Sequence, residues 1–544
     1  MEASTRDAAM REGSGALERG EWASARACFA AALEAGDSPE AIDGLGLALW
    51  YLGSVAEGIA ARERAFEEFA RARRCDDAAR VAVWVSHQHM VGGRASAARG
   101  WLARAERLLE GIGDCAGHGW VAVERARHAE HVSEQAAHAR RAIEIARATG
   151  ADELEVFALS MLGRAEMSAH HESGMRLLEE AMVAAAAGRV RTVNVLAEAY
   201  CNLIIACTSA GEWERATEWC EIVDEFARDY AATPLLGACR AIHADVLIAT
   251  GHWSEAEKSL DTALATHARY VPEVGAPAVA SLAELRVQQG RLADAEELLA
   301  GREEHPSALR ALALLRIAEQ RPEVAVELLR RGLRSTVDDA VRATQLLAPL
   351  VDARLACGAL EEARENAEQL AQLAHDSGIR LVAARAKLAA AHVALADGAV
   401  DEAADCARQA LAAFSILSMP LDAGEARLTL AQALAGDSPE VAAEEARTAC
   451  AAFRDLGASR AMDRAASILR DLGAGTGGRP RGGGDLTARE REVLELITLG
   501  MTNARIAQTL VISEKTAGHH VSRILTKLGV HNRTEAALHA RSAG

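Results

Sequence analysis

Apolar residues recur along most of the chain at steps of three and four positions. From about residue 15 to residue 470 this spacing continues, without the strict alternation of apolar and polar residues that marks a β-strand. A step of three or four positions places apolar side chains on one face of an α-helix. The pattern therefore predicts a long body built entirely of helices.

A short turn motif, roughly Gly-x-(Trp/Leu)-x-x-Ala, recurs along this body. Clear copies begin at Gly20, Gly211, Gly251, Gly290, Gly358 and Gly398, and weaker copies begin near Gly53, Gly93, His131, Ala169, Gln320 and Gly436. Glycine can take the left-handed conformation that ends a helix. The Trp or Leu two positions later fills the open end of a helical hairpin, and the alanine lets the two helices approach closely. Successive copies lie about 30 to 42 residues apart, which is the period of helical-hairpin repeats.

These hairpins resemble tetratricopeptide-type repeats, about a dozen of them, although their lengths depart from the usual 34 residues. The resemblance implies a stacked array that curls into a superhelix with a concave groove. We expect an all-α fold in three parts. A tetratricopeptide-like solenoid spans 1–472, a flexible Gly-rich linker spans 473–485, and a C-terminal domain spans 486–544.

The net charge of the chain divides unevenly between these parts. Residues 474–544 carry ten basic and six acidic side chains, a net of +4, which leaves −22 on the rest of a chain whose total is −18. Phosphate would be repelled by the body and attracted by the C-terminal part. The asymmetry predicts that only the C-terminal part meets nucleic acid.

Motifs that would indicate an enzyme are missing from the body. The chain has no Gly-x-x-x-x-Gly-Lys-(Ser/Thr), no His-Glu-x-x-His and no Gly-x-Ser-x-Gly. The ten cysteines do not have the spacing of a zinc site. The histidines at 87–89 and 128–138 have no acidic or cysteine ligands at matched spacing. We therefore expect no catalytic residue, no metal and no cofactor, and we expect these histidines to be exposed and solvated: His87, His89, His128, His131 and His138.

The location of the chain is also predicted from its sequence. The N-terminus has no basic region followed by an apolar run, so a signal peptide is not expected. No apolar stretch approaches the roughly 18 residues that a membrane span needs. The sequence predicts a cytoplasmic protein that does not bind a membrane.

Aromatic residues, only 3% of the chain, gather between residues 200 and 270. This clustering is typical of a pocket or of a groove for a partner, with these candidates: Tyr200, Trp213, Trp219, Tyr230 and Trp253. The alternative is that Trp213 and Trp253 only fill the hairpin turns described above. We favour the turn-filling interpretation and keep the groove for a ligand or partner as a hypothesis.

The C-terminal domain carries an ordered set of motifs. They are Leu486-Thr-x-Arg-Glu, Asn503-x-x-Ile-Ala, Ile512-Ser-x-x-Thr, His520-x-x-x-Ile524 and Lys527-Leu-Gly-Val530 with Arg533. These motifs resemble the four-helix, helix-turn-helix domain of LuxR/FixJ-type transcriptional regulators, over about a ninth of the chain. With the repeats, the chain resembles the large maltotriose-sensor-type LuxR regulators without their ATPase module.

The third helix of this domain is predicted to be the recognition helix. Ala517, Val521, Ile524, Leu525 and Leu528 recur at core spacing on one face. A helix that presents polar side chains on the other face fits the major groove, where base edges are readable. The expected DNA-binding residues are Thr502, Asn503, Lys515, Thr516, His519, His520, Ser522, Arg523 and Lys527.

Gly518 departs from the family pattern. The resemblance implies a lysine at this position, often a base contact, and the glycine removes it. Glycine inside a helix also costs about 1 kcal/mol relative to alanine. His519 and Ser522 are then left to read bases.

The sequence thus predicts a transcriptional regulator of double-stranded DNA, acting as a homodimer through the final helix at about 534–540. The body is expected to sense a ligand or a protein partner and to control dimerisation or access to DNA. The alternative is a tetratricopeptide-like interaction scaffold that binds DNA only for its localisation.

Overall fold

The computed structural model describes most of the repeat body and part of the C-terminal domain. Described residues are 2–473, except 168–169, 186, 188–189, 191, 231–232, 271–274, 335 and 337–338, followed by 493–494, 496–498, 501–510, 518, 520–521, 524–525 and 533–542. Contacts divide the chain into two compact units, Met1–Ile468 and Leu469–Gly544. The predicted boundaries 1–472, 473–485 and 486–544 lie close to this division and stay predictions.

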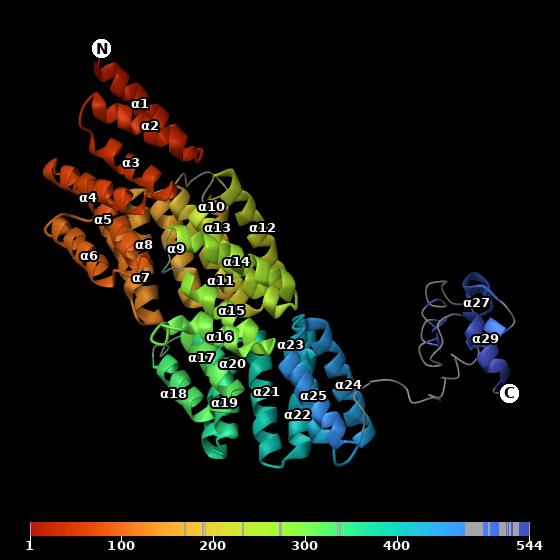
Figure 1. The fold of residues 1–544 in the computed structure, drawn as a ribbon. Coiled ribbons are helices and arrows are strands. Elements are labelled where there is room, and N and C mark those ends of the chain that lie inside the picture. Colours follow the sequence, from red (N-terminus) through yellow and green to blue (C-terminus); the bar gives the residue numbers. More distant parts are fainter. Residues whose placement is uncertain are drawn as a thin grey trace. The chain divides into compact units, whose positions relative to one another are not determined.

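The first unit is a stack of antiparallel helical hairpins (Figure 1). The first six hairpins are α1 (Glu2–Glu18) with α2 (Trp22–Glu34), α3 (Pro39–Tyr51) with α4 (Val55–Arg71), α5 (Cys75–Val91) with α6 (Ala95–Leu109), α7 (Ala116–His128) with α8 (Val132–Thr149), α9 (Asp152–Glu166) with α10 (His171–Ala184), and α11 (Val193–Ala210) with α12 (Trp213–Asp229). The next six are α13 (Thr233–Ala249) with α14 (Trp253–Tyr270), α15 (Ala276–Gln288) with α16 (Leu292–Leu299), α17 (Leu309–Ala318) with α18 (Pro322–Leu333), α19 (Ala340–Ala356) with α20 (Leu360–Ser377), α21 (Arg380–Ala396) with α22 (Val400–Ile416), and α23 (Pro420–Leu434) with α24 (Pro439–Leu456). The helix α25 (Ser459–Asp471) follows them, and a 3₁₀ turn, η3 (Pro306–Ala308), precedes α17.

The hairpin turns have the geometry that the repeated motif predicts. Gly211 has a φ of 78°, and the next backbone N–H, of Glu212, donates to the carbonyl of Cys207 at 2.9 Å. Trp213 then begins α12 as a buried plug, and Ala216 is completely buried. All six clear copies have a glycine with positive φ and a fully buried alanine five positions later. The turn prediction is confirmed at these copies.

Two of the weaker copies show how the turn tolerates other residues. Gln320 adopts the left-handed conformation with a φ of 61°, in place of glycine. His131 is extended, with a φ of −103°, so the turn from α7 to α8 is built differently. Ala169 lies outside the described residues.

The odd-numbered helices form the inner layer of the stack. Almost every odd-numbered helix of the body contacts the odd-numbered helix of the next hairpin, as α5 contacts α7, α9 contacts α11, and α19 contacts α21. Each even-numbered helix packs mainly on its own hairpin and on the hairpin that follows. This wedge-like packing curves the array, as expected of helical solenoids.

The curvature brings distant hairpins into contact within this unit. A Cβ placed on Gly20, in the first turn, would lie 2.5 Å from the carbonyl oxygen of Tyr230, at the end of α12. Gly211 lies in the same way against Leu381 of α21, and α11 contacts α21 directly. A superhelix is therefore present, and its successive turns touch.

The helix α11 corrects one expectation from the sequence. It is 18 residues long with a mean hydropathy of 1.3, so by length and composition it reaches what a membrane span needs. Half of it is buried, and it packs between α9, α12, α13 and α21. Its apolar character is explained by this position in the inner layer, where residues such as Leu203 and Ile204 are fully buried.

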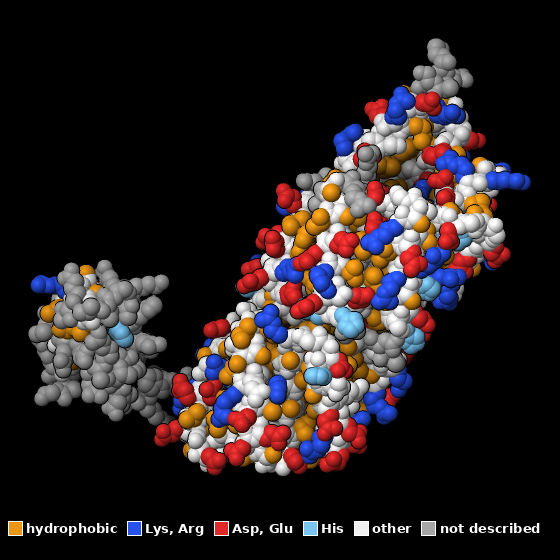
Figure 2. Space-filling model, turned by 180° about the vertical axis from the view of Figure 1, so that it is seen from behind, with side chains coloured by type: hydrophobic (Ala, Val, Ile, Leu, Met, Phe, Trp, Pro, Cys, Tyr) orange, Lys and Arg blue, Asp and Glu red, His pale blue; other side chains and the backbone are white. Residues whose placement is uncertain are grey.

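Acidic and basic side chains are interspersed over the face of the body shown in Figure 2. Many arginines of the body pair with a carboxylate outside their own helix, as Arg125 does with Glu106 of α6 at 2.7 Å and Arg141 with Asp114, between α6 and α7, at 2.8 Å. Exposed pairs of this kind stabilise a fold by less than about 1 kcal/mol each. In these pairs, however, arginines of the body are neutralised by carboxylates of the body itself.

Candidate nucleic-acid interface

The second unit has a small apolar core that joins its described helical segments. The buried residues are Val493, Leu494, Ile497, Ile506, Ala507, Val521, Ile524 and Ala536, with Leu510 and Leu525 partly buried against them. Val521, Ile524 and Leu525 stand at positions that the sequence assigned to the inner face of the third helix. The predicted inner face of the third helix is therefore confirmed at its described residues, whereas Ala517 and Leu528 lie outside them.

The helix α27 (Asn503–Leu510) begins after a capping threonine, Thr502. Thr502 Oγ1 accepts a hydrogen bond from the backbone N–H of Arg505 at 3.4 Å, and its carbonyl accepts from Ile506 at 2.9 Å. Arg533, at the start of α29 (Arg533–Ser542), donates to the carbonyl of Met501. This arginine holds the last helix against the start of α27, so its role in the described residues is structural.

Three of the nine predicted DNA-binding residues are described. Thr502 is exposed, and Asn503 and His520 are partly buried. A Cβ placed on Gly518 would lie 3.6 Å from Nδ2 of Asn503, so the start of α27 lies beside the helical segment that contains residues 518, 520 and 521. The other six residues lie outside the described part of the chain: Lys515, Thr516, His519, Ser522, Arg523 and Lys527.

We expect Gly518→Ala to stabilise this domain. The added Cβ meets only an ordinary van der Waals contact, and the residue is helical without a positive φ. Alanine is favoured over glycine inside a helix by about 1 kcal/mol. The measurement is the urea midpoint of residues 474–544, which should rise; an unchanged or lower midpoint would contradict the helical placement of Gly518.

The segment 485–540 matches the family described as "Bacterial regulatory proteins, luxR family". The spore germination protein GerE of Bacillus subtilis is 49% identical over 53 residues, which are 10% of this chain and 72% of GerE. The chain belongs to the luxR family. Its residues 485–540 form the LuxR-type helix-turn-helix, the DNA-binding domain of a transcriptional regulator.

Other relatives match this domain alone. The transcriptional activator DevR/DosR of Mycobacterium tuberculosis is 40% identical over 91 residues, 16% of this chain and 42% of that protein. The regulator DegU of Brevibacillus brevis is 49% identical over 59 residues, 11% of this chain and 25% of that protein. The chain thus spans less than half the length of these two regulators.

Solved structures resemble the LuxR-family chain over its length only loosely. Yeast Tom70 covers 82% of this chain and 99% of its own at 12% identity, with a TM-score of 0.35. The APC/C assembly Cut9–Hcn1 covers 85% and 97% at 13% identity, with a TM-score of 0.37. The repeat architecture of the body therefore stands on its own turns and contacts.

The five candidate groove residues of the body lie in different places. Tyr200, Trp219 and Tyr230 belong to one aromatic cluster with Phe226, in which neighbouring ring centroids lie 4.5–6.0 Å apart. This cluster packs on Trp22 and Tyr51 of the first two hairpins. It therefore helps to join two turns of the superhelix.

Trp213 and Trp253 are plugs of hairpin turns, as the alternative interpretation expects. Both are buried, at 9% and 3% exposure, and Trp253 Nε1 donates to the carbonyl of Ile248 at 3.0 Å. The structure thus brings three of the five residues together and leaves these two at separate turns.

The expectation of exposed histidines is wrong. His89 is 7% exposed, His87 and His128 are largely buried, and His131 and His138 are of intermediate exposure. His87 and His128 each lie near a carboxylate, at 3.3 Å from Glu198 and 3.1 Å from Glu124. Helical spacing alone could not show which side of a helix faces the inner layer. Among the described residues, no three His, Cys, Asp or Glu side chains form a group able to hold a metal ion.

His87 and His128 belong to a buried charge network that the sequence did not predict. Arg127 pairs with Glu124 on its own helix and lies 3.3 Å from Glu198 of α11. Burial alone would raise the pKa of Glu124, but Arg127 and His128 lower the pKa to about 2. Burial and the nearby Arg127 lower the pKa of His87 to about 4. One signal was present in the sequence, since Glu198 is the only charged residue between 193 and 211.

Proposed function

We propose that this LuxR-family chain is a cytoplasmic, sequence-specific transcriptional regulator that binds promoter DNA as a homodimer. The observation that carries the proposal is the match of 485–540 to the LuxR domain, with its apolar core in place. The third helix is proposed to enter the major groove, with His519 and Ser522 near base edges. Lys515, Arg523 and Lys527 are proposed to neutralise phosphates, and Thr502 and Thr516 to hydrogen-bond the DNA backbone.

The repeat body is proposed to be regulatory. Its net charge of −22 keeps it off DNA, and its arginines largely pair with its own carboxylates. A stacked superhelix offers an extended inner surface for a ligand or a partner. In this proposal, occupancy of the body changes how the DNA-binding domain dimerises or reaches DNA.

The test is to recover and sequence fragments of genomic DNA that the purified full-length chain retains. We expect a small number of loci that share a sequence of two half-sites, because a dimer reads two adjacent major grooves. Residues 1–468 alone serve as the control and should retain nothing. Random recovery of fragments would instead favour the interaction scaffold, in which DNA contact is only for localisation.

A further inference from the structure

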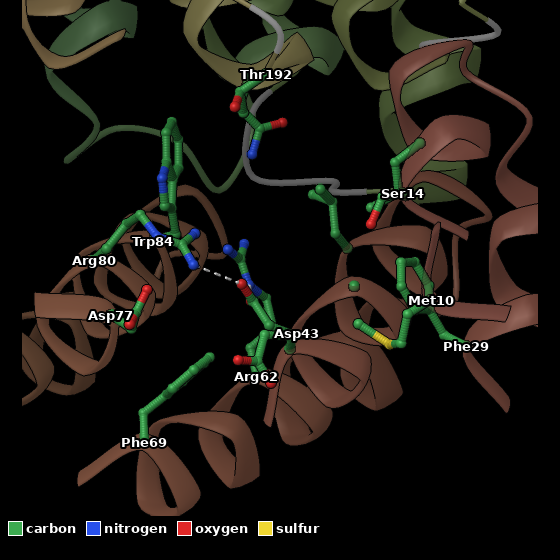
Figure 3. Close-up of a pocket in the computed structure, with 15 residues that line it drawn as sticks. Met10, Ser14, Phe29, Asp43, Arg62, Phe69, Asp77, Arg80, Trp84 and Thr192 are labelled. Carbon is green, nitrogen blue, oxygen red and sulfur yellow. Dashed lines mark hydrogen bonds and ion pairs between the residues drawn. The ribbon is translucent and has the colours of Figure 1, made fainter. Parts of the chain in front are cut away.

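A pocket of about 210 Å³ lies among the first hairpins of the body, close to the start of α11 (Figure 3). Apolar side chains of the inner helices, including Leu17 of α1 and Leu47 of α3, form part of its wall. Five charged side chains also line it, and ion pairs join three of them, Asp43, Arg62 and Arg80. The pocket is below the usual range of about 300–1,000 Å³ for drug-sized ligands, so its size suits a small metabolite.

Arg62 reaches this pocket by an unusual path. It belongs to α4, an outer helix, and its side chain crosses Gly46 of α3. A Cβ on Gly46 would lie 2.5 Å from Cγ of Arg62, so only glycine leaves room for this crossing. Arg62 is 2% exposed, which is rare for an arginine. The fold therefore delivers a guanidinium to the pocket at a steric and desolvation cost.

Asp43 alone does not balance the two arginines beside it. Its carboxylate lies 2.9 Å from Nε of Arg62 and 3.2 Å from Nη2 of Arg80, and Figure 3 shows the two arginines converging on it. Nη1 of Arg62 is buried and has no hydrogen-bond partner among the described residues. A buried donor without a partner is costly, and a second anion would satisfy it.

The other two carboxylates of the pocket are already paired elsewhere. Glu40 accepts from Arg74 and, at 2.7 Å, from the hydroxyl of Ser38. Asp77 lies 2.8 Å from Nη2 of the same Arg74. Arg74 thus serves two carboxylates, so the three arginines and three carboxylates of this cluster balance in charge. What remains unmet is the buried donor Nη1 of Arg62, which neither Glu40 nor Asp77 reaches.

We propose that this pocket binds a small organic acid, whose carboxylate pairs with Arg62 and Arg80 and whose apolar part lies against Leu17 and Leu47. A planar guanidinium suits a carboxylate because it offers parallel N–H donors. The apolar wall selects an acid with a short hydrocarbon or aromatic body over an inorganic anion.

The pocket also joins two turns of the superhelix. Thr192 and Asn194, at the start of α11, line it together with the first hairpins. Asn194 accepts a hydrogen bond from Tyr51 of α3, and Thr192 donates to Glu153 of α9 at 2.7 Å. An acid bound here would stabilise the contact between the first hairpins and the start of α11 by mass action. That such a ligand regulates DNA binding rests on the proposed function; the binding itself does not.

The test uses the full-length chain and two matched pairs of probes, phenylacetate with phenylacetamide and hexanoate with hexanamide. Calorimetric titration should show saturable binding of at least one acid and about ten- to a hundredfold weaker binding of its amide. Arg62→Gln should lower the affinity for the acid by about the same factor. Arg408→Gln, the same change at an exposed residue of α22, should leave the affinity unchanged.

A second variant separates loss of the site from loss of the fold. Ser14 lines the pocket and is exposed on α1, so Ser14→Leu narrows the pocket without touching the arginines. It should abolish binding of the acid while the helical circular dichroism and the melting temperature stay unchanged. Binding of the acids in Ser14→Leu with wild-type affinity, equal affinity for acid and amide, or no binding of any probe would each overturn the proposal. None of these measurements involves DNA. Acid binding can therefore be disproved while the proposed DNA-binding function stands, and the reverse also holds.

Discussion

Replacing Lys515 and Arg523 together with glutamine is expected to lower the affinity for DNA about a hundredfold. Each side chain is proposed to make one charge-assisted contact with phosphate, and the loss of one such contact costs about tenfold. Because each contact releases about one counterion, the slope of log K against log salt should become shallower by about two. The measurement is a binding isotherm of the full-length chain on a retained genomic fragment at several salt concentrations.

The control for this prediction removes the same charge from the body. Lys258 and Arg408 are exposed on α14 and α22, so Lys258→Gln with Arg408→Gln changes the net charge equally. If phosphate contacts act locally, this control keeps the affinity and the slope of the wild type. A Lys515 and Arg523 variant that behaves like the control would disprove the assignment of the third helix.

Local features of the fold were predictable because they depend on neighbours in the sequence. Gly211, Trp213 and Ala216 stand at fixed offsets in one turn, and each adopts the conformation or burial that its offset predicts. Thr502 likewise caps α27 through a residue three positions away. Such contacts are set by helix geometry and need no knowledge of how the hairpins stack.

Features that depend on stacking were not predictable in the same way. His87 is buried because α5 and α11 meet in the curled body, although Glu198 lies more than a hundred residues further along the chain. In the sequence, Arg62 is typical of a solvated residue on an amphipathic helix. It is buried because Gly46 has no Cβ and so leaves room for its side chain. The sequence does single out Asp43, because it is the only charged residue from 41 to 56 in a largely apolar run. A single charge on an apolar inner helix is costly unless it has a partner, so it marks a site worth inspection.

Arg127→Met is expected to destabilise the body by about 3–5 kcal/mol, the cost of breaking a buried ion pair. Arg127 is largely buried between two carboxylates, those of Glu124 and Glu198, and Glu124 is completely buried. Its guanidinium also lies 5.1 Å from the ring centroid of Phe157. Without the arginine, two negative charges remain enclosed without their main counter-ion. Urea unfolding of residues 1–468, followed by tryptophan fluorescence, reports this loss because Trp84 and Trp120 pack around the same ring.

The pH dependence distinguishes this cause from simple loss of packing. In the wild type, Glu124 has a pKa of about 2 against an ordinary 4.5, so its stabilisation is complete above pH 4.5 and is lost as the pH falls toward 2. His87, with a pKa of about 4 against 6.5, destabilises the wild type as the pH falls from 6.5. In Arg127→Met, burial without the cation raises the carboxylate pKa values, so protonation restores stability on acidification. The difference in unfolding free energy between Arg127→Met and the wild type should therefore shrink from about pH 7 to about pH 5. A loss of packing alone would leave this difference constant. Arg125→Met, on the exposed side of the same helix, should cost less than about 1 kcal/mol at both values.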